Sequence, residues 1–277
     1  MSLNSNSSGT AAVIQMVSGL DLQANLENAQ QQLLKAKERG AMLAVLPENF
    51  AVFGSRQLQG AGAAEFDQQG PIRTWMARQA KDIGLWLVGG TIPCVEKVNN
   101  PERVRAACFV YDDKGQQAAR YDKIHLFDVD VSDVHGSYRE SDNFEAGQDL
   151  VLVDTPIGKL GLTTCYDLRF AEMYLALVEQ GAQVISNGAA FTKTTGEAHW
   201  QVLLRARAIE TQCYILAAAQ GGTHGKRETY GHSMIIDPWG TVLDELELGA
   251  GCISADIDLA HLQQLRQRMP VASHRRL

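Results

Sequence analysis

The sequence predicts a single α/β domain built around a mixed β-sheet. Strand-like and helix-like segments alternate along the chain, which is typical of parallel strands joined by helices, and turn signatures between neighbouring strands add antiparallel hairpins. The 277 residues fit one larger α/β unit. No stretch rich in Pro, Gly or Ser separates the two halves, so we expect one domain over residues 11–277.

The first half of the chain contains strands, two helices and a hairpin. Short apolar runs predict strands at residues 11–17, 42–46 and 85–91. Apolar residues recur at helical spacing from 22 to 39, and Gly40 follows as the residue that ends this helix. Residues 71–83, which begin with proline, predict a second helix. Residues 104–111 and 116–121 flank Asp-Asp-Lys-Gly and predict a hairpin.

The second half has a similar order of elements but a different sequence. Residues 150–154 and 159–164 predict a hairpin across a Pro-Ile-Gly turn, and residues 234–237 and 241–246 predict another across a Pro-Trp-Gly turn. Periodicity predicts helices at 171–180 and 197–210 and strands at 184–186 and 214–219. Strand–helix alternation together with hairpins again indicates a mixed sheet.

Composition places the chain among globular proteins and argues against two classes of partner. Hydrophobic residues make up 45% and charged residues 21%, close to globular averages. The longest apolar run covers only residues 213–219, whereas a membrane span needs roughly 20 residues, so no membrane association is expected. The net charge is −7 without a basic block, and nucleic-acid binding needs a clustered positive surface.

The cysteines and the first residues indicate a reducing, cytoplasmic location. Five cysteines are scattered without a C-x-x-C pair, which predicts neither a disulfide framework nor a zinc site. Residues 1–10 are polar and rich in Ser and Asn, and they lack the basic and apolar regions of a signal peptide. We therefore expect residues 1–10 to be a disordered leader or a cloning remnant.

Three ionisable residues follow predicted strands and are candidates for chemistry. Glu48 follows the strand at 42–46, Lys123 follows the hairpin, and Cys165 comes directly after the strand that ends at Thr164. Ligands of open α/β sheets bind outside the carboxyl ends of strands, so these side chains could converge. Each also has a structural alternative, since cysteine is among the most buried residue types. The polar residues after Cys165 favour a chemical role over packing.

Three stretches resemble the catalytic motifs of the nitrilase superfamily and occur in the same order. They are Leu46-Pro47-Glu48-Asn49-Phe50, Tyr121-Asp122-Lys123-Ile124-His125-Leu126-Phe127-Asp128 and Thr164-Cys165-Tyr166-Asp167-Leu168-Arg169-Phe170. The resemblance extends over almost the whole chain from Ala11, and stretches at 198–214 and 230–240 are most similar to the Nit branch. It implies a nitrilase-like α-β-β-α sandwich, a homodimer assembled through the outer helices, and a Glu-Lys-Cys triad.

The resemblance also implies a role for each site residue. Cys165 would attack the amide carbonyl and form a thioester, and Glu48 would act as general base and acid. Lys123 and the backbone N–H of Tyr166 would stabilise the oxyanion. Glu140 would match the family's second glutamate, which positions Lys123 or the substrate, although a solvated loop acid is the alternative. No metal or cofactor is required.

The Nit branch resembles amidases of deaminated glutathione, so the implied substrate is a small amide with two carboxylates. We expect substrate contacts from Arg169 and from Asn187, Phe191 and Thr192. His224, Lys226 and Arg227, in the loop at 221–230, are further cations that could bind carboxylates, or they could be solvated. The alternative is ω-amidase activity on 2-oxoglutaramate, which uses the same triad with ammonia as the leaving group.

Other chemistries have less support. His125 is the histidine nearest a strand end and offers a Cys–His dyad as an alternative. The sequence contains no H-E-x-x-H motif, no G-x-G-x-x-G and no P-loop, so neither metal nor nucleotide is expected. A non-catalytic interaction protein of the same fold is a distant alternative, because such a protein should tolerate loss of a triad member.

Overall fold

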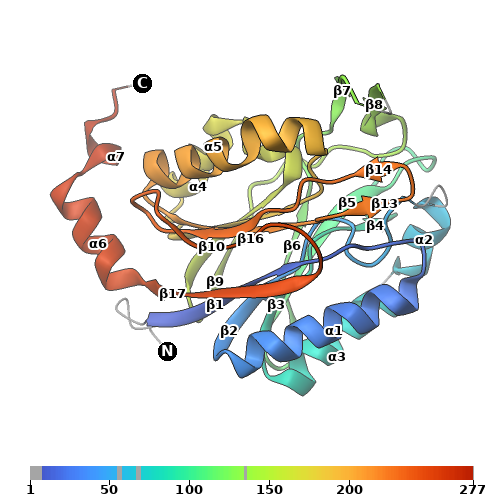
Figure 1. Cartoon of the computed structure of the whole chain (residues 1–277), viewed down its shortest axis with the longest axis horizontal. Helices are drawn as coiled ribbons and strands as arrows, with labels where there is room; N and C mark the ends of the chain where they lie inside the picture. The colour runs from blue at the N-terminus through green and yellow to red at the C-terminus, as the bar shows by residue number, and fades with distance from the viewer. Residues whose placement is uncertain (1–7, 55–57, 67–69, 134–135, 277) are drawn as a thin grey trace.

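Two β-sheets lie face to face, and helices cover the outer face of each (Figure 1). The computed structural model describes residues 8–54, 58–66, 70–133 and 136–276. The first sheet has the order β17 (Gly251–Asp258), β1 (Ser8–Gln15), β2 (Ala41–Val45), β3 (Trp86–Val88), β5 (Arg105–Tyr111) and β4 (Ile92–Cys94), and β6 (Gln117–Asp122) also pairs with β5. Strands β1, β2 and β3 are parallel, whereas β17 and β5 run antiparallel to their neighbours.

The second sheet has six strands. Its order is β16 (Val242–Leu246), β15 (Ser233–Ile236), β12 (Tyr214–Ala219), β11 (Val184–Ala189), β10 (Gly158–Thr164) and β9 (Leu152–Thr155). Strands β10, β11 and β12 are parallel, and the others are antiparallel. Two small hairpins lie outside the sheets: β7 (Asp128–Asp130) with β8 (Ser137–Arg139), and β13 (Thr223–His224) with β14 (Arg227–Glu228).

The helices complete four layers. Helices α1 (Leu22–Glu38) and α3 (Pro71–Ile83) cover the first sheet, and α4 (Ala171–Glu179) and α5 (Lys193–Thr211) cover the second (Figure 1). The remaining helices are α2 (Leu58–Ala64), α6 (Leu259–Arg268), α7 (Val271–His274) and the short 3-10 turns η2 (Glu140–Asp142) and η3 (Cys165–Arg169). None of the helices in the described residues is long and apolar enough to cross a bilayer.

The alternation of side chains along the strands creates three hydrophobic layers. In β1, Val13 faces the layer between the sheets and Ile14 faces α1 and α3. In β12, Leu216 faces the layer between the sheets and Ile215 faces α4 and α5. Because both faces of these strands are buried, they contain nearly continuous apolar runs, as is typical of parallel strands covered on both sides.

A direct contact between the sheets brings the strand ends together. The backbone N–H of Met16, just after β1, donates to the carbonyl of Ala219 at the end of β12 over 3.3 Å. The side chain of Gln15 accepts from the backbone N–H of Ser233 at 2.9 Å. The ends of strands from both sheets therefore meet at one edge of the sandwich, where the segments with the candidate residues also emerge.

Most predicted elements, and the predicted α-β-β-α sandwich, are confirmed. Helix α3 has the predicted bounds, and α1 ends one residue early, before Gly40 with its φ of +81°. The strand predicted at 85–91 is wrong in extent, because it ends at Val88 and Gly90 turns the chain with a φ of +52°. A Cβ at Gly90 would clash with the Pro47 carbonyl, so only glycine fits there.

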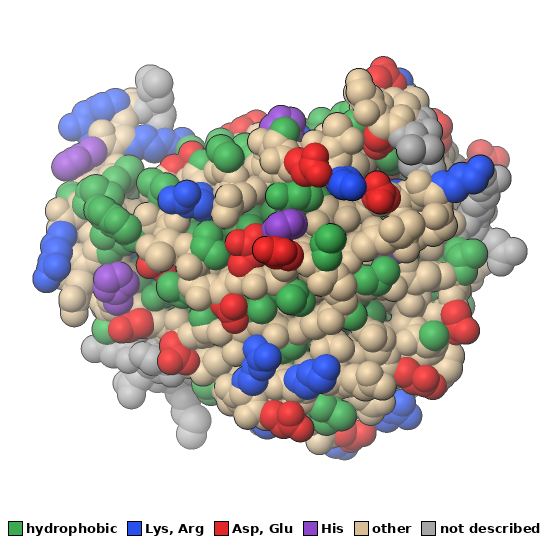
Figure 2. Space-filling view, viewed as in Figure 1, with side chains coloured by type: hydrophobic (Ala, Val, Ile, Leu, Met, Phe, Trp, Pro, Cys, Tyr) green, Lys and Arg blue, Asp and Glu red, His purple; other side chains and the backbone are tan. Residues whose placement is uncertain are grey.

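The two ends of the chain differ from the prediction. Strand β1 begins at Ser8, so residues 8–10 belong to the domain and not to a leader, whereas residues 1–7 lie outside the described residues. Strand β17, which was not predicted, pairs with β1 over eight residue pairs. On the face that Figure 2 shows, Lys and Arg side chains are interspersed with Asp and Glu and form no broad basic patch.

Candidate active site

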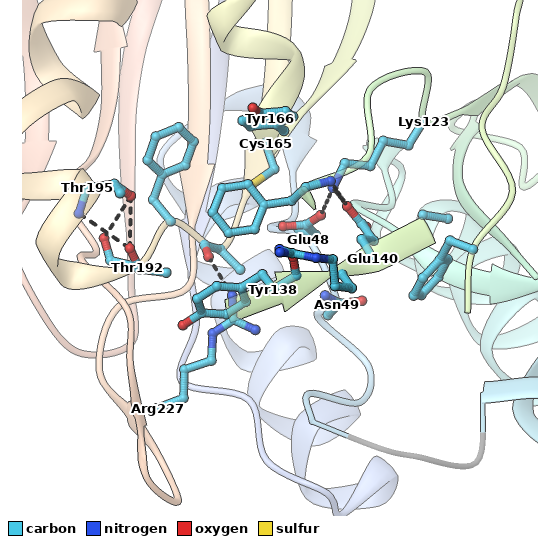
Figure 3. Close-up of a pocket in the computed structure, with 16 residues that line it drawn as sticks. Glu48, Asn49, Lys123, Tyr138, Glu140, Cys165, Tyr166, Thr192, Thr195 and Arg227 are labelled. Atoms are coloured by element: carbon cyan, nitrogen blue, oxygen red, sulfur yellow. Dashed lines mark hydrogen bonds and ion pairs between the residues drawn. The ribbon is translucent and has the colours of Figure 1, made fainter. Parts of the chain in front are cut away.

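Glu48, Lys123 and Cys165 converge on one cavity of about 230 Å³ (Figure 3). Glu48 follows β2, Lys123 follows β6, and Cys165 follows β10, so both sheets contribute to the site. All three side chains are at least 90% buried. The sequence-based expectation that these strand ends meet is therefore correct.

The ammonium of Lys123 lies between two carboxylates. Its Nζ donates to Glu48 Oε1 at 2.9 Å and to both carboxylate oxygens of Glu140, at 2.9 and 2.8 Å (Figure 3). Burial by itself would lower the pKa of Lys123, but the charges of Glu140 and Glu48 outweigh it and raise that pKa well above its ordinary value. Lys123 is therefore a fixed positive charge.

Glu140 belongs to the site rather than to the solvent. Its Oε2 also accepts the backbone N–H of Phe127 at 2.7 Å, which fixes the carboxylate against Lys123. Burial raises the pKa of Glu140, Lys123 opposes this shift, and the nearby Glu48 carboxylate adds to it. Two carboxylates share one ammonium, so the site carries excess negative charge and holds protons readily.

Cys165 occupies a sharp turn between β10 and α4. It is the first residue of η3 and adopts the left-handed conformation, with a φ of +46°, which costs a non-glycine residue roughly 1 kcal/mol. Burial and the Glu48 carboxylate raise the pKa of its thiol, whereas Lys123 and the backbone N–H of Ala190 lower it. The Glu48 carboxylate is close enough to raise the pKa of the thiol, so a base lies beside the nucleophile.

Asp167 joins the segment that carries Cys165 to the segment that carries Lys123. This fully buried carboxylate accepts the hydroxyl of Tyr121 at 2.6 Å and the backbone N–H of Thr164 at 2.8 Å. Its other oxygen accepts the backbone N–H of His125 at 3.1 Å and contacts His125 Nδ1 at 2.7 Å. This role of Asp167 was not predicted, although Thr164-x-x-Asp167 has the spacing of a capping box.

Gln220 of the second sheet holds the segment that carries Glu48, and it was also missed. Its Nε2 donates to the backbone carbonyl of Glu48 at 3.1 Å and to Ser18 Oγ at 2.9 Å. Its Oε1 accepts the backbone N–H of Ser18 at 3.0 Å. No local pattern marks Gln220, because its partners are about 170 to 200 residues away in the sequence.

Two of the predicted substrate contacts line the cavity and two do not. Phe191 and Thr192 line it, as does Tyr166. Asn187 is fully buried elsewhere, where its amide donates to Thr163 Oγ1 at 3.0 Å. Arg169 lies outside the cavity, with its guanidinium 5.5 Å from the centre of the Phe191 ring. The structure therefore places Asn187 and Arg169 outside the lining of this cavity, and their contact with substrate stays a prediction.

The backbone N–H of Tyr166 belongs to the first turn of η3. The first N–H groups of a helical turn have no partner within the turn and are suited to binding an oxyanion. The oxyanion role of Tyr166 stays a prediction.

Other residues that line the cavity come from several separate segments of the chain and were not predicted to lie together. They are Asn49, Ala106, Phe127, Tyr138, Arg139, Phe144, Ala190, Thr195 and Arg227. Of the basic loop, only Arg227 lines this cavity, whereas His224 is tied to the carbonyl of Ser18 by its Nδ1 at 2.6 Å and Lys226 is exposed. Cavity-lining hairpin β7–β8 contributes Tyr138 and Arg139.

Within the described residues the site offers no histidine base and no metal ligands. The ring of His125 stacks on Phe170 with 3.6 Å between ring centres, and His125 does not line the cavity. A Cys–His dyad is thus not supported by this geometry. No group of three or more His, Cys, Asp or Glu side chains among the described residues could hold a metal ion.

The sequence and the fold have close counterparts among known proteins. The pattern of the family described as carbon-nitrogen hydrolase matches residues 10–267. The chain is 43% identical over 266 residues to the deaminated glutathione amidase of Yersinia enterocolitica, covering 96% of this chain and 92% of that protein. It is 41% identical over 268 residues to the human deaminated glutathione amidase, covering 96% and 81%.

Two solved structures have the same fold over nearly all of this chain. The NitFhit protein of C. elegans matches with a TM-score of 0.88 and 38% identity, over 98% of this chain and 66% of that one. Saccharomyces cerevisiae Nit3, described as a member of branch 10 of the nitrilase superfamily, matches with a TM-score of 0.87 and 27% identity, over 99% of both chains.

Proposed function

The chain belongs to the carbon–nitrogen hydrolase family, and from this premise we propose that it is an amidase that hydrolyses deaminated glutathione to 2-oxoglutarate and cysteinylglycine. The family places its chemistry among hydrolases of carbon–nitrogen bonds other than peptide bonds. The named activity is supported by relatives of about 40% identity over nearly the full chain that are called deaminated glutathione amidases.

The observation that carries the proposal is the convergence of Cys165, Glu48 and Lys123 on one cavity, with Lys123 bonded to Glu48. An amide is a poor electrophile, and a sulfur nucleophile divides its hydrolysis into acylation and deacylation. Glu48 takes the thiol proton as Cys165 attacks the carbonyl carbon, and it then delivers that proton to the departing amine. General acid–base assistance of this kind contributes about 10²–10⁴ in rate.

Lys123 and the backbone N–H of Tyr166 are proposed to stabilise the oxyanion. The charge of Lys123 is fixed before the substrate arrives, because Glu48 and Glu140 already orient its ammonium. Such preorganised charge stabilises a transition state without reorganisation. In deacylation, Glu48 activates a water molecule that attacks the thioester and releases 2-oxoglutarate. We propose Glu140 as the residue that positions Lys123.

The size of the cavity favours a second candidate, ω-amidase activity on 2-oxoglutaramate. A volume of about 230 Å³ is below the usual range of about 300–1,000 Å³ for ligand sites. The smaller amide would fit entirely inside, whereas the cysteinylglycine part of deaminated glutathione would extend through the cavity mouth. Both substrates have the same acyl group and use the same residues.

Steady-state kinetics on the purified protein distinguish the two. We expect kcat/KM for deaminated glutathione to exceed that for 2-oxoglutaramate, with simple nitriles and N-carbamoyl amino acids as comparison substrates and Cys165→Ala as the inactive control. A tenfold or greater preference for 2-oxoglutaramate, about 1.4 kcal/mol of transition-state discrimination, would support the ω-amidase instead.

We also propose a cytoplasmic homodimer. All five cysteines are free and buried, as suits a reducing compartment. Val202 and Ile209 of α5 and Trp239 of the β15–β16 turn are exposed large apolar side chains on the outer layer. Arg205 Nε donates to the carbonyl of Gly240 at 2.9 Å, so this turn and α5 form one surface that a second copy could cover.

A further inference from the structure

Arg227 lines the cavity and forms no ion pair with a carboxylate in the part of the chain that the structure describes. Its guanidinium lies 4.9 Å from the ring centre of Phe53 and 5.4 Å from that of Tyr138. Figure 3 shows Arg227 beside Tyr138. One terminal nitrogen, Nη2, donates to the carbonyl of Ala190 at 3.2 Å. Its Nε is buried and has no hydrogen-bond partner.

The other two cations of the cavity are already paired. Lys123 is bound by Glu48 and Glu140, and Arg139 Nη2 donates to Asp130 at 2.9 Å. Arg227 is therefore the partly buried cavity cation without a carboxylate partner among the described residues, whereas Arg139 is exposed and paired. A guanidinium that contacts two aromatic rings is restricted in orientation, and its planar fork fits a carboxylate with two parallel hydrogen bonds.

Ala190 lies between Arg227 and the nucleophile Cys165 along the cavity wall. Its carbonyl accepts from Arg227 at 3.2 Å, and its N–H is near enough to Cys165 to lower the pKa of the thiol. Cys165, Ala190 and Arg227 also line the same cavity, so the path from the sulfur to the guanidinium through Ala190 is on the order of 10 Å.

We propose that Arg227 binds the carboxylate at the acyl end of the substrate and so selects amides whose acyl group ends in a carboxylate. This inference rests on the proposed amidase function and specifies which part of the substrate the cavity recognises. In a 2-oxoglutaryl group the carboxylate is about 5 Å from the carbonyl carbon that sulfur attacks, which fits the available path. The glycine carboxylate of the leaving dipeptide lies on the other side of the scissile bond, about 7 Å from it when the dipeptide is extended.

A set of amides that differ by single groups tests the proposal. Glutaramate and pentanamide have the same five carbons, and only glutaramate ends in a carboxylate. We expect Arg227→Met to lower kcat/KM by about 10–100-fold for glutaramate, 2-oxoglutaramate and deaminated glutathione alike. For pentanamide, kcat/KM should change by less than about twofold, because this substrate has no carboxylate for Arg227 to bind. Arg227→Lys, which keeps the charge without the fork, should give an intermediate loss.

Lys226→Met is the matched control, because it removes a positive charge from the neighbouring residue, which is exposed and outside the cavity lining. All of its rate constants should equal those of the wild type. An equal loss on pentanamide in Arg227→Met would mean that Arg227 only supports the cavity wall. A loss confined to deaminated glutathione would assign Arg227 to the glycine carboxylate, and no loss would refute the proposal.

Direct binding separates failure of this inference from failure of the proposed function. Isothermal titration of 2-oxoglutaramate, glutaramate and pentanamide into Cys165→Ala and into Cys165→Ala with Arg227→Met needs no turnover. If the wild type hydrolyses none of these amides, the amidase function fails. The Arg227 inference still stands if the two carboxylated amides bind Cys165→Ala and lose about 10–100-fold in affinity with Arg227→Met. Equal affinities in both proteins would overturn it.

Discussion

The thiol of Cys165 is held in its neutral form until a base removes its proton. Burial and the neighbouring Glu48 carboxylate both raise its pKa. A neutral thiol is a weak nucleophile, because the thiolate is the reactive form, so the resting enzyme is protected from stray electrophiles. The carboxylate that disfavours the thiolate is also the base beside the thiol. Proton transfer to Glu48 is therefore expected to accompany attack on the substrate.

Replacing Cys165 tests this directly. Cys165→Ala and Cys165→Ser should each lower kcat/KM by at least about 10³-fold, since the nucleophile of a covalent mechanism has no substitute. The fold should survive because the changed side chain is small. Kinetics, circular dichroism, and mass spectrometry of the acyl adduct formed with a reactive ester are the measurements. Full activity in the alanine variant with an unchanged spectrum would contradict the assignment.

Asp167 should affect catalysis without touching the substrate, because it positions both η3 and the segment after β6. In Asp167→Asn one of the two acceptor oxygens becomes an amide nitrogen, so either the bonds from Tyr121 and Thr164 or the bond from the His125 N–H is lost. We expect kcat to fall about 10–100-fold with KM nearly unchanged, and stability to fall by about 1.5–3 kcal/mol.

The control for this prediction is Asp256→Asn, which removes an exposed carboxylate bound to Thr10 Oγ1 and should leave both quantities unchanged. Separate measurement of kcat, KM and denaturant unfolding distinguishes positioning from stability alone. An Asp167→Asn enzyme that is less stable but has the wild-type kcat would show that Asp167 only supports the fold.

At the scale of an element, strand β5 combines structural burial with a titratable group. All seven of its residues are buried, and Cys108 faces the layer between the two sheets. Burial raises the pKa of this thiol from 9.0 to about 12, and the charge of Asp122 adds to the shift. The folded protein therefore keeps a proton in a range of pH where the unfolded chain releases it.

This shift predicts a loss of stability at alkaline pH. The contribution of Cys108 is complete below about pH 9, and it is lost as pH rises toward 12, because only the unfolded state ionises in that range. Over the full range it amounts to on the order of 4 kcal/mol. Urea unfolding between pH 8 and 11 should show a steeper decline in the wild type than in Cys108→Ala. Parallel declines in the two proteins would refute the assignment.

For the whole molecule, the sequence predicted the parts of the fold that depend on local patterns. Helix α3 and strand β12 have the expected bounds, because a proline start and an unbroken apolar run are local signals. Strand β17 was missed because its pairing with β1 joins residues about 240 positions apart. Residues 253–258 do alternate between apolar and polar side chains, which is a local signal for a strand, but no local signal shows that its partner is β1.

In the candidate site too, residues marked by local patterns were predicted, and residues placed by long-range packing were not. Glu48, Lys123 and Cys165 could be found because each follows a recognisable strand and belongs to a motif. Asn187 was predicted to contact substrate but lies outside the cavity lining. Which side of β11 faces the cavity depends on how the strand lies in its sheet, and a single sequence does not reveal this. The cavity is also built by Arg227 and Tyr138 from two separate hairpins, and their approach depends on the packing of the complete molecule.

The proposed homodimer is tested on the outer surface formed by α5 and the β15–β16 turn. Val202→Glu combined with Trp239→Glu places two charges on exposed apolar positions. Burying unpaired charges in an interface is strongly unfavourable, so the mass from light scattering should fall from that of a dimer to that of one chain. The matched control is Leu20→Glu, an exposed apolar residue before α1, which should leave the mass unchanged. An unchanged mass in the double variant would place the interface elsewhere.

The pairing of β1 with β17 also sets the order in which the chain can assemble during synthesis. Strand β1 is made first, yet one of its two edges is paired only by residues 251–258. At a translation rate of about 5–20 residues per second, roughly 10–50 s pass between the emergence of the two strands from the ribosome. Throughout that interval the nascent chain exposes an unpaired strand edge, which is a site for misassociation. We therefore expect this topology to increase the need for chaperones during translation more than it affects the stability of the folded protein.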